Sequence, residues 1–262
     1  MGLTGSHWVG LPEGIAPEMR RYHQQVSRFS AAFAFLSDVS MIVLGGGLKR
    51  REKLSARLGD ILSAMYLVSC TLKRYEDEGR QAADAPLAHW AIWDAMFRAQ
   101  NAFEGVISNY PSRAVAWLLR RVIFPLGRPY VVPADRLGHE VARLLIEGSA
   151  TRDRLTAGMF IPRDESDAVG TVEAALAAVS DAEPIEQKIR AAQRAQQLVT
   201  DDGPAAIEEA LRSGILSRGE AEKLARARQL VERVIKVDDF DQDFGLSEAL
   251  RSSEQAGDAV PA

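Results

Sequence analysis

The sequence predicts an all-α protein: a helical bundle with long antiparallel helices, followed by a smaller C-terminal helical subdomain. Apolar residues recur at steps of three and four along most of the chain, which is the period of one helix face. Glycines and prolines divide these periodic stretches into segments of helical length. Alternating β-branched segments are absent from the sequence, and the run Tyr130–Val132 is too short to predict a strand.

Two long helices are expected after a flexible lead-in, residues 1–16, which contains four glycines. Pro17 suits the first turn of a helix, and the apolar stripe behind it runs as far as Gly45–Gly47. Glycine inside a helix costs about 1 kcal/mol, so this glycine run should end the first helix. A second helix is expected over residues 48–78, with Gly79 as its stop.

Prolines set the borders of the next elements. A third helix should begin near Asp84, as its N-cap, and break at Pro111. Pro111 can also start the next helix, which is expected over residues 112–124. Three prolines within residues 125–133 predict an extended connection, and a helix over residues 135–146 should come after it.

The bundle is expected to span residues 17–165 and the smaller subdomain residues 166–244. The helices predicted beyond the irregular stretch 158–170 cover residues 170–180, 184–197, 204–213 and 218–235. Pro184 should begin the second of these, and Ser217 with Glu220 has the capping-box pattern at the start of the last. The helical ion pairs expected are Glu186 with Arg190 and Glu222 with Arg226. The acidic tail, residues 245–262, is predicted to be disordered.

Composition narrows the class of protein. A chain of 262 residues can bury a sizeable core without a disulfide or a metal. Its net charge of −4 and isoelectric point near 5.7 argue against a nucleic-acid partner. The only cysteine, Cys70, lies between Val68 and Leu72 in a helical pattern, which favours a buried packing thiol over a nucleophile. The most apolar stretch, Phe29–Leu44, contains Asp38 and three serines, so we expect no transmembrane segment, which needs about 20 apolar residues.

Three weak motifs favour structural over chemical interpretations. Gly45–Gly47 lacks the spacing of a phosphate-binding loop and comes after a helix, so it is better explained as a helix-breaking hinge. The four histidines lie far apart, without the spacing of metal ligands. Asp239–Gly245 resembles a calcium loop, but Leu250 stands where a glutamate is required, so an acidic tail or a docking segment is favoured. We therefore assign no catalytic, cofactor-binding or metal-binding residue.

The stretch from Arg113 to Val132 is the best candidate for a binding surface. Arginines alternate there with aromatic and aliphatic residues, and such a helix can lie on an anionic membrane surface. A core helix with solvated arginines explains the same pattern and is favoured slightly. The candidate membrane or partner surface consists of Arg113, Trp117, Arg120, Arg121, Phe124 and Arg128.

Seven short blocks, in order between residues 20 and 241, resemble the C-terminal portion of bacterial long-chain acyl-CoA dehydrogenases. Those enzymes act in fatty-acid β-oxidation and are associated with the inner membrane. The blocks are Leu36–Met41, Leu48–Glu52, Ser55–Asp60, Leu72–Arg80, Ile123–Arg128, Ala150–Arg152 and Val237–Asp241.

The resemblance implies a flavoenzyme in which a glutamate takes the α-proton of acyl-CoA and the flavin of FAD accepts the β-hydride, giving trans-2-enoyl-CoA. In that family the glutamate sits in a Glu-Gly-Ala-Asn-like motif, ahead of the portion that this chain resembles. Glu-Gly pairs begin here at Glu13, Glu78, Glu104 and Glu147, and none continues with Ala-Asn. We therefore expect no catalytic glutamate and no FAD in this chain, with FAD in the full enzyme.

Two functions are expected. The first is a non-catalytic helical C-terminal domain that packs on the catalytic region of an acyl-CoA dehydrogenase, on the same or a separate chain. It would support assembly, including a homo-oligomer, or membrane association in the bacterial cytoplasm, as a peripheral contact with the inner membrane. The alternative is a stand-alone helical scaffold or adaptor that binds another protein.

Overall fold

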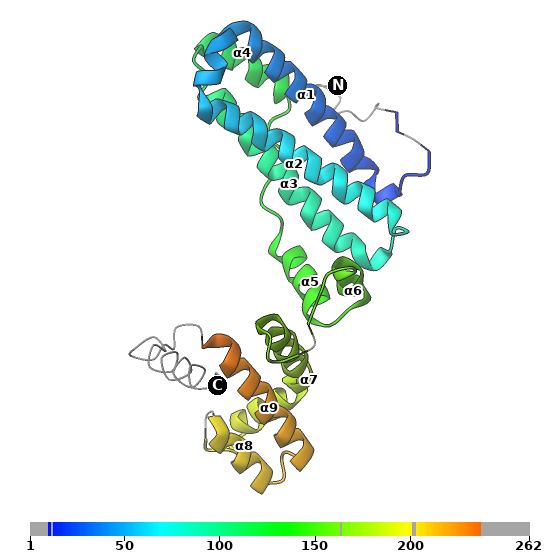
Figure 1. Ribbon diagram of the computed structural model, residues 1–262, viewed down its shortest axis with the longest axis vertical. Coiled ribbons are helices and arrows are strands. Elements are labelled where there is room, and N and C mark those ends of the chain that lie inside the picture. Colours follow the sequence, from blue (N-terminus) through cyan, green and yellow to red (C-terminus); the bar gives the residue numbers. More distant parts are fainter. Residues whose placement is uncertain (1–9, 12, 163, 201–202, 237–262) are drawn as a thin grey trace, which may run out of the picture. The chain divides into compact units, whose positions relative to one another are not determined.

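The computed structural model describes residues 10–11, 13–162, 164–200 and 203–236 (Figure 1). This described part is helical and contains no strand, so the predicted all-α fold is confirmed. Its α-helices are α1 Arg20–Leu44, α2 Glu52–Asp77, α3 Ala85–Ser108, α4 Arg113–Ile123, α5 Asp135–Ile146, α6 Ala150–Thr156, α7 Ala168–Arg194, α8 Gly203–Arg212 and α9 Arg218–Ile235. The predicted disordered tail, residues 245–262, and most of the predicted lead-in lie outside the described residues.

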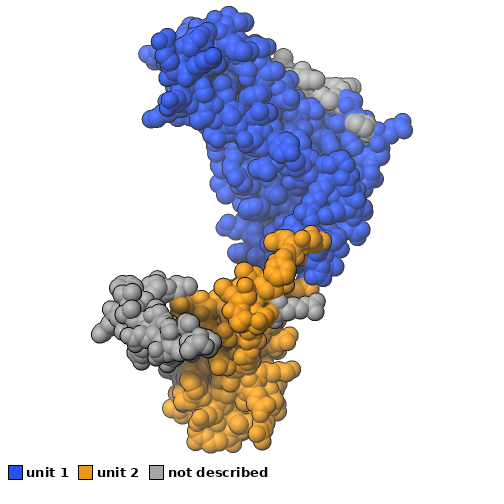
Figure 2. Space-filling model, viewed as in Figure 1, with its two compact units in different colours: residues 1–145, 149–155 blue, residues 146–148, 156–262 orange. Residues whose placement is uncertain are grey.

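The chain divides into two compact units (Figure 2). Unit 1 comprises residues 1–145 and 149–155, and unit 2 comprises residues 146–148 and 156–262. Each unit has a hydrophobic core of its own.

Unit 1 is built on α1, α2 and α3, which pack side by side (Figure 1). Their apolar stripes meet in one core, where Phe29 of α1 lies edge-to-face on Phe103 of α3 at a ring distance of 5.5 Å. The extended connection after α4 is fixed to this core by α3. Gln100 donates to the Tyr130 carbonyl and accepts from the Tyr130 N–H, at 2.6 and 3.1 Å. A buried amide side chain therefore holds the middle of the proline-rich connection against α3.

The glycine run does end α1, but the next segment differs from the prediction. Gly45 has a φ of +48°, a conformation that glycine adopts more easily than other residues. The segment Gly45–Arg50 then forms a 3₁₀ helix, and α2 begins at Glu52 rather than at residue 48. The tighter 3₁₀ winding suits a short connector between two long helices.

Unit 2 corrects two expectations. Pro184 lies inside α7, which is continuous from Ala168 to Arg194, so the two helices predicted over residues 170–180 and 184–197 are one. Proline removes a single backbone hydrogen bond, and the buried stripe of α7 against α9 holds the helix across that gap. The expected pair of Glu222 with Arg226 is also wrong. Arg226 instead pairs with Glu165, at 2.5 Å.

Helix α9 begins as the sequence predicts. Ser217 accepts a hydrogen bond from the Glu220 N–H, and the Glu220 carboxylate accepts from the Ser217 N–H at 2.9 Å, which completes the capping box. Lys188 of α7 donates to the same carboxylate. The hydrogen bond from Lys188, together with those from Ser217, lowers the pKa of Glu220 to about 2.

One helical stretch in the described part of the chain, Pro17–Arg50, is long and apolar enough to cross a membrane by length and composition alone. The expected absence of a transmembrane segment is therefore not confirmed by length and composition. The same stretch supplies Phe29 and Leu36 to the core of unit 1, although only 11% of its most apolar window is buried. Most of the outer side of α1 is thus left uncovered within unit 1.

Candidate functional site

The predicted binding surface centres on α4, at the end of unit 1 where α1 ends and α2 begins (Figure 1). Ser112 caps α4 by accepting from the Val115 N–H at 3.4 Å. Leu119 and Ile123 are buried and fasten the helix to the bundle. Trp117, on the outer side, is 62% exposed. The helix is therefore amphipathic, with an aromatic residue on its solvent side.

Five of the six predicted residues are exposed: Arg113, Trp117, Arg120, Arg121 and Arg128. The guanidinium of Arg121 lies 5.7 Å from the centre of the Trp117 ring, a cation–π contact that holds both groups at the surface.

Arg120 has a structural partner. Its guanidinium donates to both carboxylate oxygens of Glu104, at 2.9 and 2.6 Å, and so ties α4 to α3. Partial burial alone would raise the pKa of Glu104, but hydrogen bonds from Ser108 and Arg120 lower it below its ordinary value. Arg120 thus fixes the position of α4.

Phe124 does not belong to the surface, which corrects its assignment. Its ring is 8% exposed and packs edge-to-face on Phe103 at 6.2 Å. Pro125 restricts the residue before it, and Phe124 accordingly leaves the helical conformation, with φ at −120°. That turn points the ring inward instead of along the exposed side of α4.

The structure adds residues that the sequence patterns did not single out. Met41, Ile42 and Val43, in the last turn of α1, are exposed, Ile42 to 82%. Their helix packs on α4. Three consecutive cations, Lys49, Arg50 and Arg51, are exposed in the connector between α1 and α2. We call the combination of Met41–Val43, Lys49–Arg51, Arg113, Trp117, Arg121 and Arg128 the basic–apolar end of unit 1.

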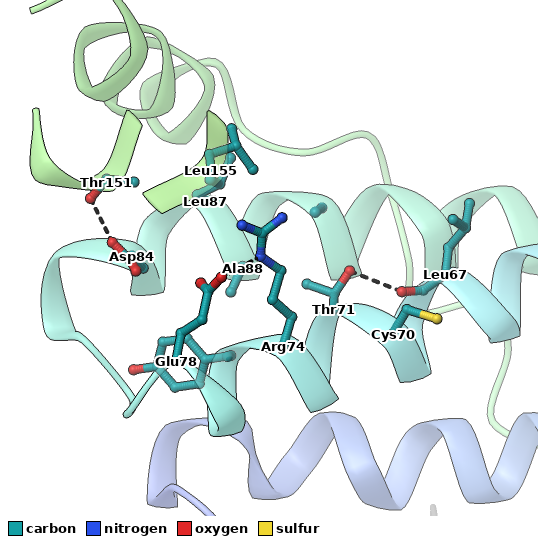
Figure 3. A pocket seen from close by; sticks show the side chains of 12 residues that line it. Leu67, Cys70, Thr71, Arg74, Glu78, Asp84, Leu87, Ala88, Thr151 and Leu155 are labelled. Atoms are coloured by element: carbon teal, nitrogen blue, oxygen red, sulfur yellow. Dashed lines mark hydrogen bonds and ion pairs between the residues drawn. The ribbon is translucent and has the colours of Figure 1, made fainter. Parts of the chain in front are cut away.

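A second feature of unit 1 is a pocket of about 280 Å³ between α2, α3 and α6 (Figure 3). Its walls are largely apolar and include Leu67, Thr71, Leu87, Ala88, Ala91 and Leu155. The polar atoms of the wall are satisfied by the protein itself. Thr71 donates to the Leu67 carbonyl at 2.9 Å (Figure 3), and the Tyr75 hydroxyl donates to Glu18 at 2.8 Å. Burial, together with this bond to Glu18, raises the pKa of Tyr75 to about 12.

Helix α6 is held over the pocket by charged groups. Asp84 accepts from the Thr151 hydroxyl at 2.6 Å (Figure 3) and from Arg154 Nε at 2.8 Å. Arg74 donates to the Arg154 carbonyl at 2.9 Å and to Glu78 at 2.8 Å. The hydrogen bond from Arg154 is the main cause that lowers the pKa of Asp84. The carboxylate therefore stays ionised at neutral pH, and the tie to α6 persists.

Cys70 also lines this pocket, and its thiol is exposed. The prediction of a buried thiol is wrong because the neighbours on either side, Val68 and Leu72, are the residues that face the core. On a helix of 3.6 residues per turn, the position midway between two core residues faces the other way. A hydrogen bond between Cys70 and Tyr66 raises the pKa of the Tyr66 phenol.

Neither feature fits FAD. Small-molecule sites usually enclose about 300–1,000 Å³, and the pocket falls below this range, whereas FAD is a large dinucleotide. Arg74, which lines the pocket, is paired with Glu78, and Arg154 is paired with the lining residue Asp84, so neither offers an uncommitted charge to a diphosphate. Within the described residues, no group of three His, Cys, Asp or Glu side chains is placed to hold a metal ion.

The fold and the geometry of unit 1 therefore define the class of this protein: a helical protein with a basic–apolar end and an apolar pocket. Its sequence matches the family model of the acyl-CoA dehydrogenase C-terminal domain of bacterial type over residues 1–240. The chain belongs to this family, and the resemblance inferred from the seven blocks is confirmed at that level. The family implies FAD, and association with a catalytic region, in the full enzyme. No solved structure matches the chain.

Proposed function

We propose that this chain is the non-catalytic C-terminal part of a FAD-dependent acyl-CoA dehydrogenase that makes trans-2-enoyl-CoA from long-chain acyl-CoA in fatty-acid β-oxidation. Its own role is to assemble with the catalytic region and to attach the enzyme to the cytoplasmic face of the bacterial inner membrane. The family membership of the chain supports the first part, and the basic–apolar end supports the attachment.

The basic–apolar end combines the two forces that bind a protein to an anionic membrane. Arginine and lysine near such a surface contribute about 1 kcal/mol each. Burying exposed apolar area adds about 25 cal/mol per Å². Ile42 and Trp117 supply such area from two helices that pack on each other, and the Arg121 guanidinium lies over the Trp117 ring. This juxtaposition is the observation that carries the membrane part of the proposal.

A non-catalytic role agrees with the state of the candidate glutamates. A general base must be free to approach the proton that it removes. Glu78 is paired with Arg74, and Glu104 with Arg120 and Ser108. Glu104 thus joins α3 to α4, and Glu78 forms an ion pair at the end of α2.

Vesicle co-sedimentation tests the attachment. The full chain should bind vesicles rich in phosphatidylglycerol and should bind neutral phosphatidylcholine vesicles far more weakly. Reversing two cations, with Arg121→Glu and Arg128→Glu, removes at least two contributions of about 1 kcal/mol and should weaken binding roughly thirtyfold or more. Arg120 is left in place because of its bond to Glu104.

The matched control carries the same charge change on unit 2. Arg212→Glu and Arg218→Glu alter side chains that are 77% and 88% exposed, far from the basic–apolar end in sequence. That variant should bind as the natural chain does. Equal losses in both double variants would show that only net charge matters, and undiminished binding of the first would remove this end from the proposal.

Co-purification tests the assembly. The catalytic region of the enzyme, produced with its FAD and a separate affinity tag, should retain the chain. The chain alone should neither bind FAD stoichiometrically nor oxidise palmitoyl-CoA. If it does either, the non-catalytic assignment is wrong. Recovery of another protein from the native cell, with no dehydrogenase present, would favour the adaptor alternative.

A further inference from the structure

We propose that the pocket between α2, α3 and α6 binds an unbranched aliphatic chain, such as the tail of a fatty acid or of an acyl-CoA. The pocket lies within unit 1 and shares no residue with the basic–apolar end. The inference goes beyond the proposed function and stands on the pocket itself, so it can fail while membrane attachment holds, or hold while attachment fails.

The chemistry of the wall selects an apolar ligand. Leu67, Leu87 and Leu155 face the space (Figure 3), and the hydroxyl of Thr71 is occupied by its own helix. A polar ligand would give up its hydrogen bonds to water and find few replacements here, which is costly. Apolar cavities of only about 150 Å³ are known to stay dry and to bind benzene. The present pocket, at about 280 Å³, has room for a larger apolar group.

The length of the wall along α2 favours a chain as the ligand. Its wall on α2 runs from Leu67 to Glu78, which is about 16 Å at a rise of 1.5 Å per residue. An extended hydrocarbon chain can contact an apolar wall of this length along most of its carbon atoms.

The charges at the rim do not select a head group. Arg74 is paired with Glu78, and Arg154 with Asp84, so the charged rim is neutral and internally satisfied. The polar end of the ligand should therefore remain in solvent, and the site should recognise the chain alone.

Helix α6 forms the roof of the site. It contributes Leu155 and Thr151 to the wall, and the bonds of Thr151 and Arg154 to Asp84 hold it there. An aliphatic chain can thus be covered along one side without any change in the long helices.

Cys70 provides a reporter for the experiment. It is the only cysteine of the chain, it is exposed, and it lines the pocket. The rate of its alkylation by a maleimide should fall at least fivefold in the full chain when dodecanoate saturates the site. Shorter fatty acids should bind about fourfold more weakly for each methylene removed. The affinity should stop rising with chain length once the chain is longer than the pocket.

A filled pocket separates the proposal from non-specific adsorption. Ala91→Phe places a ring in the space, whereas Ala34→Phe adds the same ring on the exposed side of α1. We expect Ala91→Phe to lose affinity for the fluorescent fatty acid cis-parinaric acid at least tenfold, and Ala34→Phe to bind unchanged. Circular dichroism and thermal melting establish that both variants are folded. If Ala91→Phe does not fold, Leu155→Trp fills the pocket from α6.

The source of the chain is distinguished by comparing ligands at equal concentration. Protection of Cys70 by dodecanoate and by dodecanoyl-CoA alike supports a site that recognises the chain alone. Protection by phosphatidylglycerol vesicles that Ala91→Phe abolishes assigns the chain to a lipid. Unchanged alkylation with every acyl ligand, or protection only by the catalytic region, would overturn the proposal and make the pocket a contact for protein.

Discussion

Asp84 accepts a hydrogen bond from Arg154 Nε at 2.8 Å, and this pair joins the start of α3 to α6 across 70 residues of sequence. Asp84 occupies the N-cap position of α3 but forms no capping bond with its side chain. Its carboxylate points to α6 instead, where Thr151 donates to it as well. A position that ordinarily stabilises its own helix therefore secures the roof of the pocket.

Replacing this carboxylate should loosen α6. In Asp84→Asn the charged partner of Arg154 is lost, so the amide protons of residues 150–156 should exchange roughly threefold to tenfold faster, while α2 and α3 keep their protection. Hydrogen exchange read by mass spectrometry measures this. Asp60→Asn, at an exposed carboxylate of α2, is the control and should leave α6 unchanged. Unaltered exchange in Asp84→Asn would mean that apolar contacts alone hold the roof.

The same pair sets a pH dependence. The bond from Arg154 makes the pKa of Asp84 lower in the folded protein than in the unfolded chain, where it is about 3.9. A carboxylate of this kind stabilises the fold above its unfolded pKa, and that contribution is lost as the pH falls through its folded pKa. Protection of α6 by the pair should be full at neutral pH and decline only below about pH 4. In Asp84→Asn this decline should vanish, and a difference that persists unchanged to pH 2 would contradict the assignment.

How far the sequence predicts the structure depends on the kind of signal. Residues 218–235 form the predicted helix because a capping box begins it, and residues 135–146 are also helical as predicted. Helix α6 was not predicted, since seven residues are too few to show a helical period. The contact that fixes α6 in place is the bond from Arg154 to Asp84. A contact between residues 70 positions apart cannot be inferred from a local sequence pattern.

The candidate surface likewise contains residues that the local pattern predicts and residues that only the fold places. Trp117 lies on the exposed side of α4, whereas Phe124 lies beyond the end of the helix and does not follow its amphipathic period. Arg120 and Arg121 look alike in the sequence, but only the three-dimensional fold brings Glu104 to Arg120. Partners from another helix decide which arginine is structural.

Pro184 offers a test of the continuous helix α7. It is exposed, so its replacement by alanine leaves no cavity. Because proline inside a helix costs about 3 kcal/mol relative to alanine, Pro184→Ala should raise the free energy of unfolding of unit 2 by about 2–3 kcal/mol. Urea denaturation monitored by circular dichroism measures the change. A lower stability in Pro184→Ala would indicate that two helices meet at this residue.

Ser217 tests the capping box at the other side of unit 2. Ser217→Ala removes the acceptor for the Glu220 N–H and should cost about 1 kcal/mol of stability. The comparison is Ser213→Ala, whose hydroxyl bonds within the last turn before α9 and is not part of the box. That substitution should stay within about 0.5 kcal/mol, as most surface changes do. Similar losses in both variants would assign the effect to the loop rather than to the cap.

Trp117 and Phe124 together test the corrected surface. Phe124 is buried against Phe103, so Phe124→Ala should destabilise the protein by about 3–5 kcal/mol through the cavity that it leaves. Trp117 is 62% exposed, and Trp117→Ala should change stability little while weakening binding to phosphatidylglycerol vesicles, because the lost ring is apolar area at the basic–apolar end. Thermal denaturation and co-sedimentation of the same two preparations measure both effects. The opposite outcome, a stable Phe124→Ala that no longer binds vesicles, would return Phe124 to the surface and displace Trp117 from it.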